Sequence, residues 1–76
     1  MSPHTPVLSG QQMVACLSHF DFSTVGQKGS HRKMRHVDGR TAIIPMHREL
    51  APGTLRSILR QSGLSINALH EWLGTS

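Results

Sequence analysis

Cysteine, acidic side chains and long hydrophobic runs are all scarce in this sequence, and each scarcity excludes a class of protein. Cys16 is the only cysteine, so the chain forms no internal disulfide and has no CxxC pair for zinc. No stretch approaches the ~20 apolar residues that span a membrane, and residues 1–6 lack the charged and apolar parts of a signal peptide. These absences predict a soluble, cytoplasmic protein.

The shortage of negative charge indicates the kind of partner. Four Asp and Glu against eight Lys and Arg give a formal net charge of +4. A basic chain favours polyanionic partners such as nucleic acid. The 76 residues make one small domain, which buries only roughly 60% of its unfolded surface. We expect a flexible leader over residues 1–8, with two prolines and no periodicity, and a single domain over residues 9–76.

An amphipathic helix is predicted directly after the leader. Ser9 and Gln12 have the spacing of a capping box, in which each side chain bonds the backbone of the other residue. Apolar residues then recur at helical spacing at Met13, Cys16, Leu17 and Phe20. Cys16 lies on this stripe, so we expect a buried side chain rather than a reactive thiol.

Two more helices are predicted in the C-terminal third. Pro52 and Gly53 open the first, and Gly63 occupies the position where helices end in a left-handed residue. Ser65 caps the second. Its apolar residues again recur at helical spacing, at Ile66, Leu69, Trp72 and Leu73.

Between the first two predicted helices the sequence favours strands. Residues 21–27 carry β-favouring side chains without a helical stripe, and residues 30–36 and 40–46 are two further extended runs. Residues 37–39 fit a hairpin loop with Gly39 left-handed, so the last two runs pair antiparallel. The predicted fold is α+β, in the order α-β-β-β-α-α, with helices packed on one face of a three-stranded antiparallel sheet.

The register of the predicted hairpin separates the two faces of the sheet. Pairing His36 with Arg40 places Met34 opposite Ala42, Arg32 opposite Ile44, and His31 opposite Pro45. Alternation then directs four apolar residues toward the helices: Met34, Ala42, Ile44 and Met46. Arg32 falls on the same side, which strains this register unless it lies at the sheet edge and reaches outward. The opposite face is basic and carries histidines: His31, Lys33, Arg35, Thr41, Ile43, Pro45 and His47.

His31 and His47 come close together in this register. As diagonal neighbours across the hairpin their Cβ atoms lie ~7–8 Å apart, within reach of one bridging phosphate. RNA carries its own nucleophile, the 2′-hydroxyl, so strand cleavage requires mainly a base, an acid and cations near the phosphate. Histidine fills either proton-transfer role near neutral pH. The sequence offers no carboxylate pair for a metal, which favours cleavage without one.

Other interpretations of the same residues are open. A basic strand face also fits an RNA-binding module without catalysis. Zinc binding by His31, His36 and His47 is disfavoured, because His36 points away from the other two and no Cys or Asp completes the set. Arg56 and Arg60 lie one turn apart on a predicted helix. One interpretation is that they bind phosphate or an acidic partner, and the other is that they belong to a solvated helix face. The remaining histidines are expected to be solvated: His4, His19 and His70.

Several motifs give the chain a specific resemblance to a known family. Residues 27–31 read Gln-Lys-Gly-Ser-His, residues 38–40 read Asp-Gly-Arg and residues 44–47 read Ile-Pro-Met-His. Residues 52–59 read Pro-Gly-Thr-Leu-Arg-Ser-Ile-Leu. In this order and spacing the motifs make residues 9–65 resemble the HicA family of small bacterial toxins.

The resemblance implies a fold like the double-stranded-RNA-binding domain and a ribonuclease that cleaves messenger RNA to arrest translation. It also implies a HicB-type antitoxin that covers the active site, and the catalytic histidine of the family falls on His31. We expect no cofactor. An inactive toxin that chiefly binds its antitoxin stays open as an alternative. The predicted site comprises His31 with His47 as acid partner, and the RNA-binding residues Lys28, Ser30, Lys33, Arg35, Arg56 and Arg60.

Overall fold

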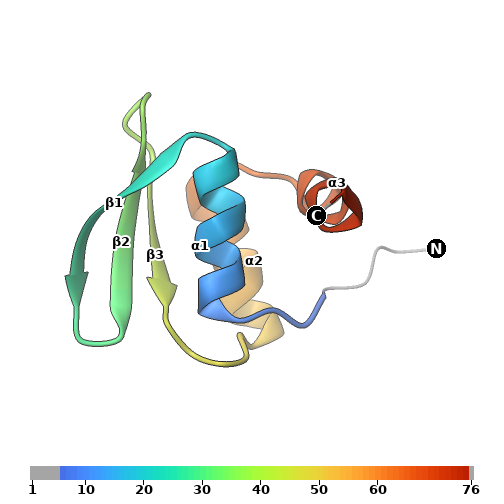
Figure 1. Ribbon diagram of the computed structural model, residues 1–76, viewed down its shortest axis with the longest axis horizontal. Helices are drawn as coiled ribbons and strands as arrows, with labels where there is room; N and C mark the ends of the chain where they lie inside the picture. Colours follow the sequence, from blue (N-terminus) through green and yellow to red (C-terminus); the bar gives the residue numbers. More distant parts are fainter. Residues whose placement is uncertain (1–5, 76) are drawn as a thin grey trace.

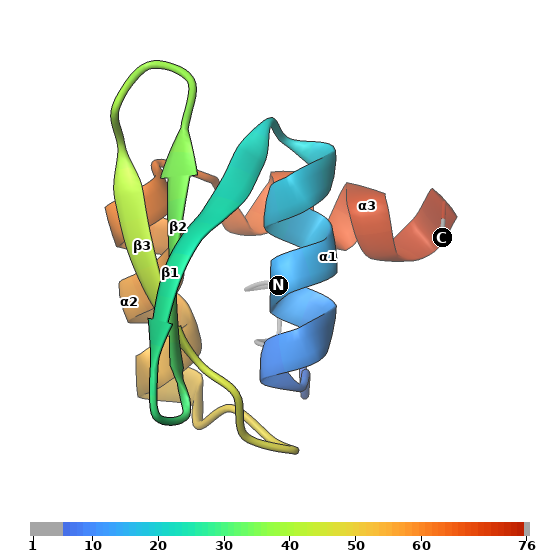
Figure 2. The same cartoon turned by 60° about the vertical axis from the view of Figure 1, so that its left-hand side comes forward.

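The computed structural model describes residues 6–75, which form a three-stranded antiparallel sheet with helices on one face (Figure 1). The elements are α1 (Gly10–His19), β1 (Phe22–Lys28), β2 (His31–His36), β3 (Thr41–Pro45), α2 (Pro52–Ser62) and α3 (Ile66–Thr75). β2 is the central strand, and Figure 2 shows the helices on one side of the sheet. The predicted fold class and element order are confirmed. Among the described residues, no helix has the length and apolar character needed to cross a membrane.

The helix boundaries follow the predicted capping residues. The Ser9 hydroxyl accepts a hydrogen bond from the Gln12 backbone N–H (3.0 Å), and the Gln12 side-chain oxygen accepts one from the Ser9 N–H (2.9 Å). Gly63 ends α2 with a φ of 74°, which glycine adopts without a Cβ clash. At the start of α3 the Ser65 hydroxyl accepts a hydrogen bond from the Ala68 N–H (3.0 Å). Each cap satisfies backbone groups that a helix end leaves unpaired.

The β2–β3 register is the predicted one. Met34 lies opposite Ala42, Arg32 opposite Ile44, and His31 opposite Pro45. The β1–β2 pairing contains a bulge that the sequence did not predict: it shifts between Thr24 and Gly26, so Val25 has no partner. Because the bulge lies in β1, the alternation of faces in β2 and β3 is unaffected.

Arg32 lies on the central strand, so the sheet edge that would relieve the strain of this register is not available to it. It is the second residue of β2, close to the turn that joins β1 to β2. Its Nε donates a hydrogen bond to the side-chain oxygen of Gln27 (2.9 Å), which lies opposite it on β1. The half-buried Arg32 therefore bonds a polar neighbour at the end of the strand, and the predicted register is kept.

The core fills the space between the sheet and the helices. Its buried apolar residues are Leu8, Met13, Cys16, Leu17, Phe22, Met34, Ala42, Ile44, Leu50, Leu55, Ile58, Leu59 and Leu69. The predicted flexible leader includes Leu8, but Leu8 is only 3% exposed and its carbonyl accepts a hydrogen bond from the Leu50 N–H (2.7 Å). The packed structure therefore includes Leu8. Residues 1–5 of the predicted leader lie outside the described residues.

Arg40 holds the β2–β3 hairpin against α2. Its Nη1 donates a hydrogen bond to the Ser62 carbonyl at the end of α2, and its guanidinium lies 5.6 Å from the centre of the Phe22 ring. Its Nε donates to the Asp38 carboxylate (2.8 Å). The backbone hydrogen bond from Arg40, with this ion pair, lowers the pKa of Asp38. The hairpin loop is thereby fixed to the rest of the domain.

Cys16 is expected to resist alkylation in the folded protein. Its side chain is fully buried, and burial raises the pKa of the thiol from 9.0 to about 11, because the thiolate would lose its hydration. Because the folded state favours the neutral thiol, Cys16 contributes to the free energy of unfolding. This contribution is complete below pH 9.0 and is lost as the pH rises toward about 11. Mass spectrometry after iodoacetamide treatment near neutral pH should show labelling in urea and very little without it. Equal labelling rates in the two conditions would contradict the burial.

Candidate nucleic-acid interface

The sheet face that the helices leave uncovered carries the predicted cations. His31 opens β2 and lies directly opposite Lys28 of β1, so both side chains project from this face. Lys33 and Arg35 follow at alternate positions of β2 and are exposed. We call this surface the outer face; it consists of Lys28, His31, Lys33, Arg35, Thr41 and Ile43.

His47 lies beside His31, although β3 ends two residues before it. The Met46 N–H donates to the Ser30 carbonyl (2.6 Å), which continues the strand pairing past the end of β3. The His47 carbonyl accepts a hydrogen bond from the Gly10 N–H (2.9 Å) at the start of α1. With the segment held in this way, the His31 and His47 rings lie 6.4 Å apart, centre to centre, at an angle of 72°. The structure thus brings together the two histidines that the register made diagonal neighbours.

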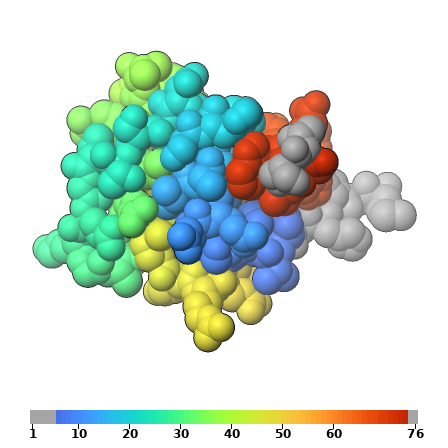
Figure 3. Space-filling model, viewed as in Figure 1, coloured from blue at the N-terminus to red at the C-terminus, as the bar shows by residue number. Residues whose placement is uncertain are grey.

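Gly10 allows α1 to approach the His47 segment this closely. A Cβ at position 10 would lie 2.2 Å from the Pro45 carbonyl oxygen and 2.9 Å from the Met46 Cα. In Figure 3 the segment after β3, in yellow, lies against the start of α1, in blue. Gly10 is not among the predicted site residues. A glycine in the first turn of a well-capped helix, where it weakens the helix, was the available signal.

The other predicted RNA-binding residues lie in two places. Ser30 is exposed in the turn between β1 and β2, and its carbonyl accepts the bond from Met46. Arg56 and Arg60 are exposed on α2, which covers the inner side of the sheet (Figure 1). The structure therefore does not place these two arginines on the outer face with His31.

His36 is separated from the other two histidines of the disfavoured zinc set. Its ring lies 5.0 Å from that of the buried Phe22, and its Nδ1 accepts a hydrogen bond from the Asp38 N–H (3.0 Å). Over residues 6–75, no three His, Cys, Asp or Glu side chains are grouped so that they could hold a metal ion.

Two polar residues near His47 are not among the predicted site residues. Arg48 follows His47 directly and Gln11 lies in the first turn of α1; both are exposed. They line a surface hollow of about 300 Å³ together with Ser9, Met46 and His47. A cation next to a candidate catalytic histidine was a usable signal for Arg48. Gln11 had none, because the hollow forms only where two segments distant in the sequence meet.

The arrangement of these groups suits chemistry at a phosphodiester. Two exposed imidazole rings lie side by side, and each can take or give a proton near neutral pH. Lys28 lies across from His31, a position from which an ammonium group can attract a phosphate and stabilise negative charge that develops on it. Proton transfer and charge stabilisation are thus available at one end of the outer face.

The fold and this surface define the class of the protein. Helices on one face of an antiparallel sheet, with cations and paired histidines on the other, make it an α+β protein like the double-stranded-RNA-binding domain. Residues 10–64, from α1 to just past the end of α2, match the family described as HicA toxin of bacterial toxin-antitoxin. The chain belongs to the HicA toxin family, as its motifs indicated. Comparison with curated proteins gave no match.

Proposed function

We propose that this toxin is an endoribonuclease that cleaves messenger RNA without a metal ion and so arrests translation. One imidazole of the His31 and His47 pair takes the proton of a 2′-hydroxyl, and the 2′-oxygen attacks the adjacent phosphorus. The bond from phosphorus to the 5′-oxygen breaks, and the other imidazole gives a proton to that leaving oxygen. The products are a 2′,3′-cyclic phosphate and a 5′-hydroxyl, and no water is consumed in this step.

The observation that carries this proposal is the 6.4 Å separation of the two rings at the basic end of the outer face. At this separation both imidazoles can reach one phosphodiester, which general acid–base catalysis of the reaction requires. Lys28 supplies charge for the phosphorane, and Lys33 and Arg35 contact phosphates farther along the strand. Ser30 donates a hydrogen bond from its exposed hydroxyl to the RNA. Arg56 and Arg60 act from the helical side by long-range attraction.

We place the antitoxin, a HicB-type protein of the same cytoplasm, on the outer face. This surface combines cations with an exposed apolar side chain, Ile43, which is 40% exposed. Acidic and apolar groups of a partner complement such a surface. An antitoxin bound there covers His31 and keeps RNA from the histidine pair.

Incubation of the purified protein with a defined single-stranded RNA in EDTA tests the proposed function. Cleavage products are expected on a denaturing gel, and expression without the antitoxin is expected to arrest growth. A protein that shifts the RNA in a native gel but never cuts it, with or without divalent metal, would instead be a binding module. A protein that neither binds nor cuts RNA and leaves growth unaffected would be one that chiefly binds its antitoxin.

A further inference from the structure

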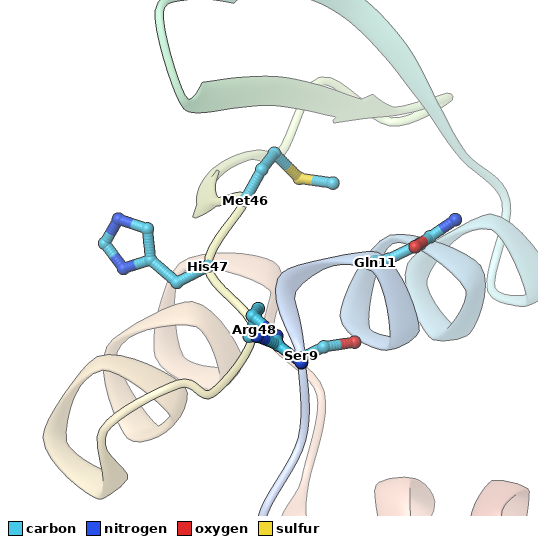
Figure 4. A pocket seen from close by; sticks show the side chains of 5 residues that line it. All are labelled: Ser9, Gln11, Met46, His47 and Arg48. Carbon is cyan, nitrogen blue, oxygen red and sulfur yellow. The ribbon is translucent and has the colours of Figure 1, made fainter.

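The hollow beside His47 is not used by the proposed cleavage step. Its walls come from the start of α1, with Ser9 and Gln11, and from the segment after β3, with Met46, His47 and Arg48. Figure 4 shows Met46 and Gln11 on the α1 side of this segment and the His47 ring on the other side. The hollow therefore adjoins the histidine pair, because His47 lines it while the ring of His47 points to the other side of the segment from Met46.

Hydrogen bonds on both sides hold the walls of the hollow in place. The segment is fixed to α1 by the bond from the Gly10 N–H to the His47 carbonyl, and to the sheet by the bond from the Met46 N–H to the Ser30 carbonyl. Ser9 is fixed by the capping box. The shape of the hollow is consequently formed in the absence of a ligand, as is usual for binding sites.

Gln11 and Arg48 present polar groups that the fold does not use. The neighbouring Gln12 completes the capping box through its side-chain oxygen. By contrast, neither the Gln11 amide nor the Arg48 guanidinium makes a hydrogen bond or ion pair with the part of the chain that the structure describes. Two adjacent glutamines thus differ in role, since one stabilises the helix and the other lines the hollow.

We propose that the hollow binds the base of the nucleotide next to the cleaved phosphate and that it prefers adenine; the identity of the ligand as RNA rests on the proposed function. A glutamine amide presents a donor and an acceptor side by side, which match N7 and the N6 amino group of adenine. The half-buried Met46 side chain supplies apolar surface for the face of the base. Arg48 binds the adjoining phosphate. A strand bound at the histidine pair reaches the hollow by crossing residues 46–48.

Binding to short RNA analogues that cannot be cut tests this inference. The probes are fully 2′-O-methylated hexamers of adenosine, cytidine or uridine with a fluorescent label, measured by anisotropy over a range of salt concentrations. Wild-type protein should prefer the adenosine probe, and Gln11→Leu should reduce that preference roughly fivefold or more. Arg48→Gln should make the plot of log K against log salt less steep by about 0.7, the effect of one lost phosphate contact. Arg60→Gln removes the same charge from α2, where it acts only by long-range attraction, so it should weaken the binding of all three probes alike and keep the adenosine preference.

The outcome separates this inference from the proposed function. An adenosine preference that depends on Gln11 supports the base site, even if unmodified RNA is never cleaved and the nuclease proposal fails. Wild-type affinity and base preference in both Gln11→Leu and Arg48→Gln would overturn the base site, even if the protein cleaves RNA. Thermal unfolding followed by circular dichroism should show that these exposed substitutions leave the fold intact.

Discussion

Replacing His31 with alanine should lower the rate of RNA cleavage by about 10²–10⁴-fold, the usual contribution of a group that transfers a proton in the transition state. RNA binding should change little, because Lys28, Lys33 and Arg35 remain on the outer face. His31 is exposed and belongs to no core contact, so the fold should be retained. Cleavage rates from gels and affinities from anisotropy provide the two measurements.

His19 offers a matched control for this substitution. It is an exposed histidine in the last turn of α1, and it forms no part of the outer face. His19→Ala should therefore cleave RNA at the wild-type rate. If His31→Ala also retained that rate, the histidine pair could not be the catalytic centre. His47→Ala should reduce cleavage as well, since it removes the second proton-transfer group.

Replacing Gly10 with alanine should damage both stability and cleavage. The new Cβ would meet the Pro45 carbonyl oxygen at 2.2 Å and the Met46 Cα at 2.9 Å, and backbone atoms cannot rotate away as a side chain does. Overpacking of this kind costs about 1–3 kcal/mol and sometimes more. Relief of the clash moves α1 away from the segment and breaks the bond that holds the His47 carbonyl. The cleavage rate of the folded variant should then fall about tenfold or more, because small misplacement of a catalytic group is costly.

Gly53→Ala is the control for the effect of glycine itself. Gly53 lies in the first turn of α2 and a Cβ there meets nothing within 4 Å. Its replacement should leave cleavage unchanged and stabilise the protein by about 0.4–1 kcal/mol. Urea unfolding of both variants, with cleavage assays under native conditions, measures the two effects. A Gly10→Ala protein as stable and active as Gly53→Ala would show that the close approach of α1 is not required.

The elements and the hairpin register could be predicted because their signals are local. Capping residues, the helical spacing of apolar side chains and the turn at Gly39 each act within a few residues, and all agree with the structure. The pairing of His31 with Pro45 then followed from counting along the hairpin. For this reason the sequence alone was enough to predict that the His31 and His47 rings lie close together.

Most features that could not be predicted depend on contacts between segments distant in the sequence. The bulge at Val25 shifts only the β1–β2 pairing, and no turn residue marks it. Arg40 reaches the end of α2, and Gly10 admits the His47 segment, through packing that no periodic pattern encodes. The hollow lined by Gln11 and Arg48 has the same origin. Arg56 and Arg60 are predicted RNA-binding residues because of their charge and their spacing on one helix face, and these signals do not reveal that the sheet separates α2 from the outer face.

The most direct test of the central claim removes one 2′-hydroxyl, the proposed nucleophile, from the RNA substrate. After the cleavage position in a defined RNA has been mapped, the same RNA is made with a single 2′-deoxynucleotide on the 5′ side of the cleaved bond. We expect cleavage at that position to stop while binding persists, and we expect the product of the unmodified RNA to end in a 2′,3′-cyclic phosphate. Continued cleavage at the deoxynucleotide would show that water is the nucleophile and would contradict the proposed role of the His31 and His47 pair.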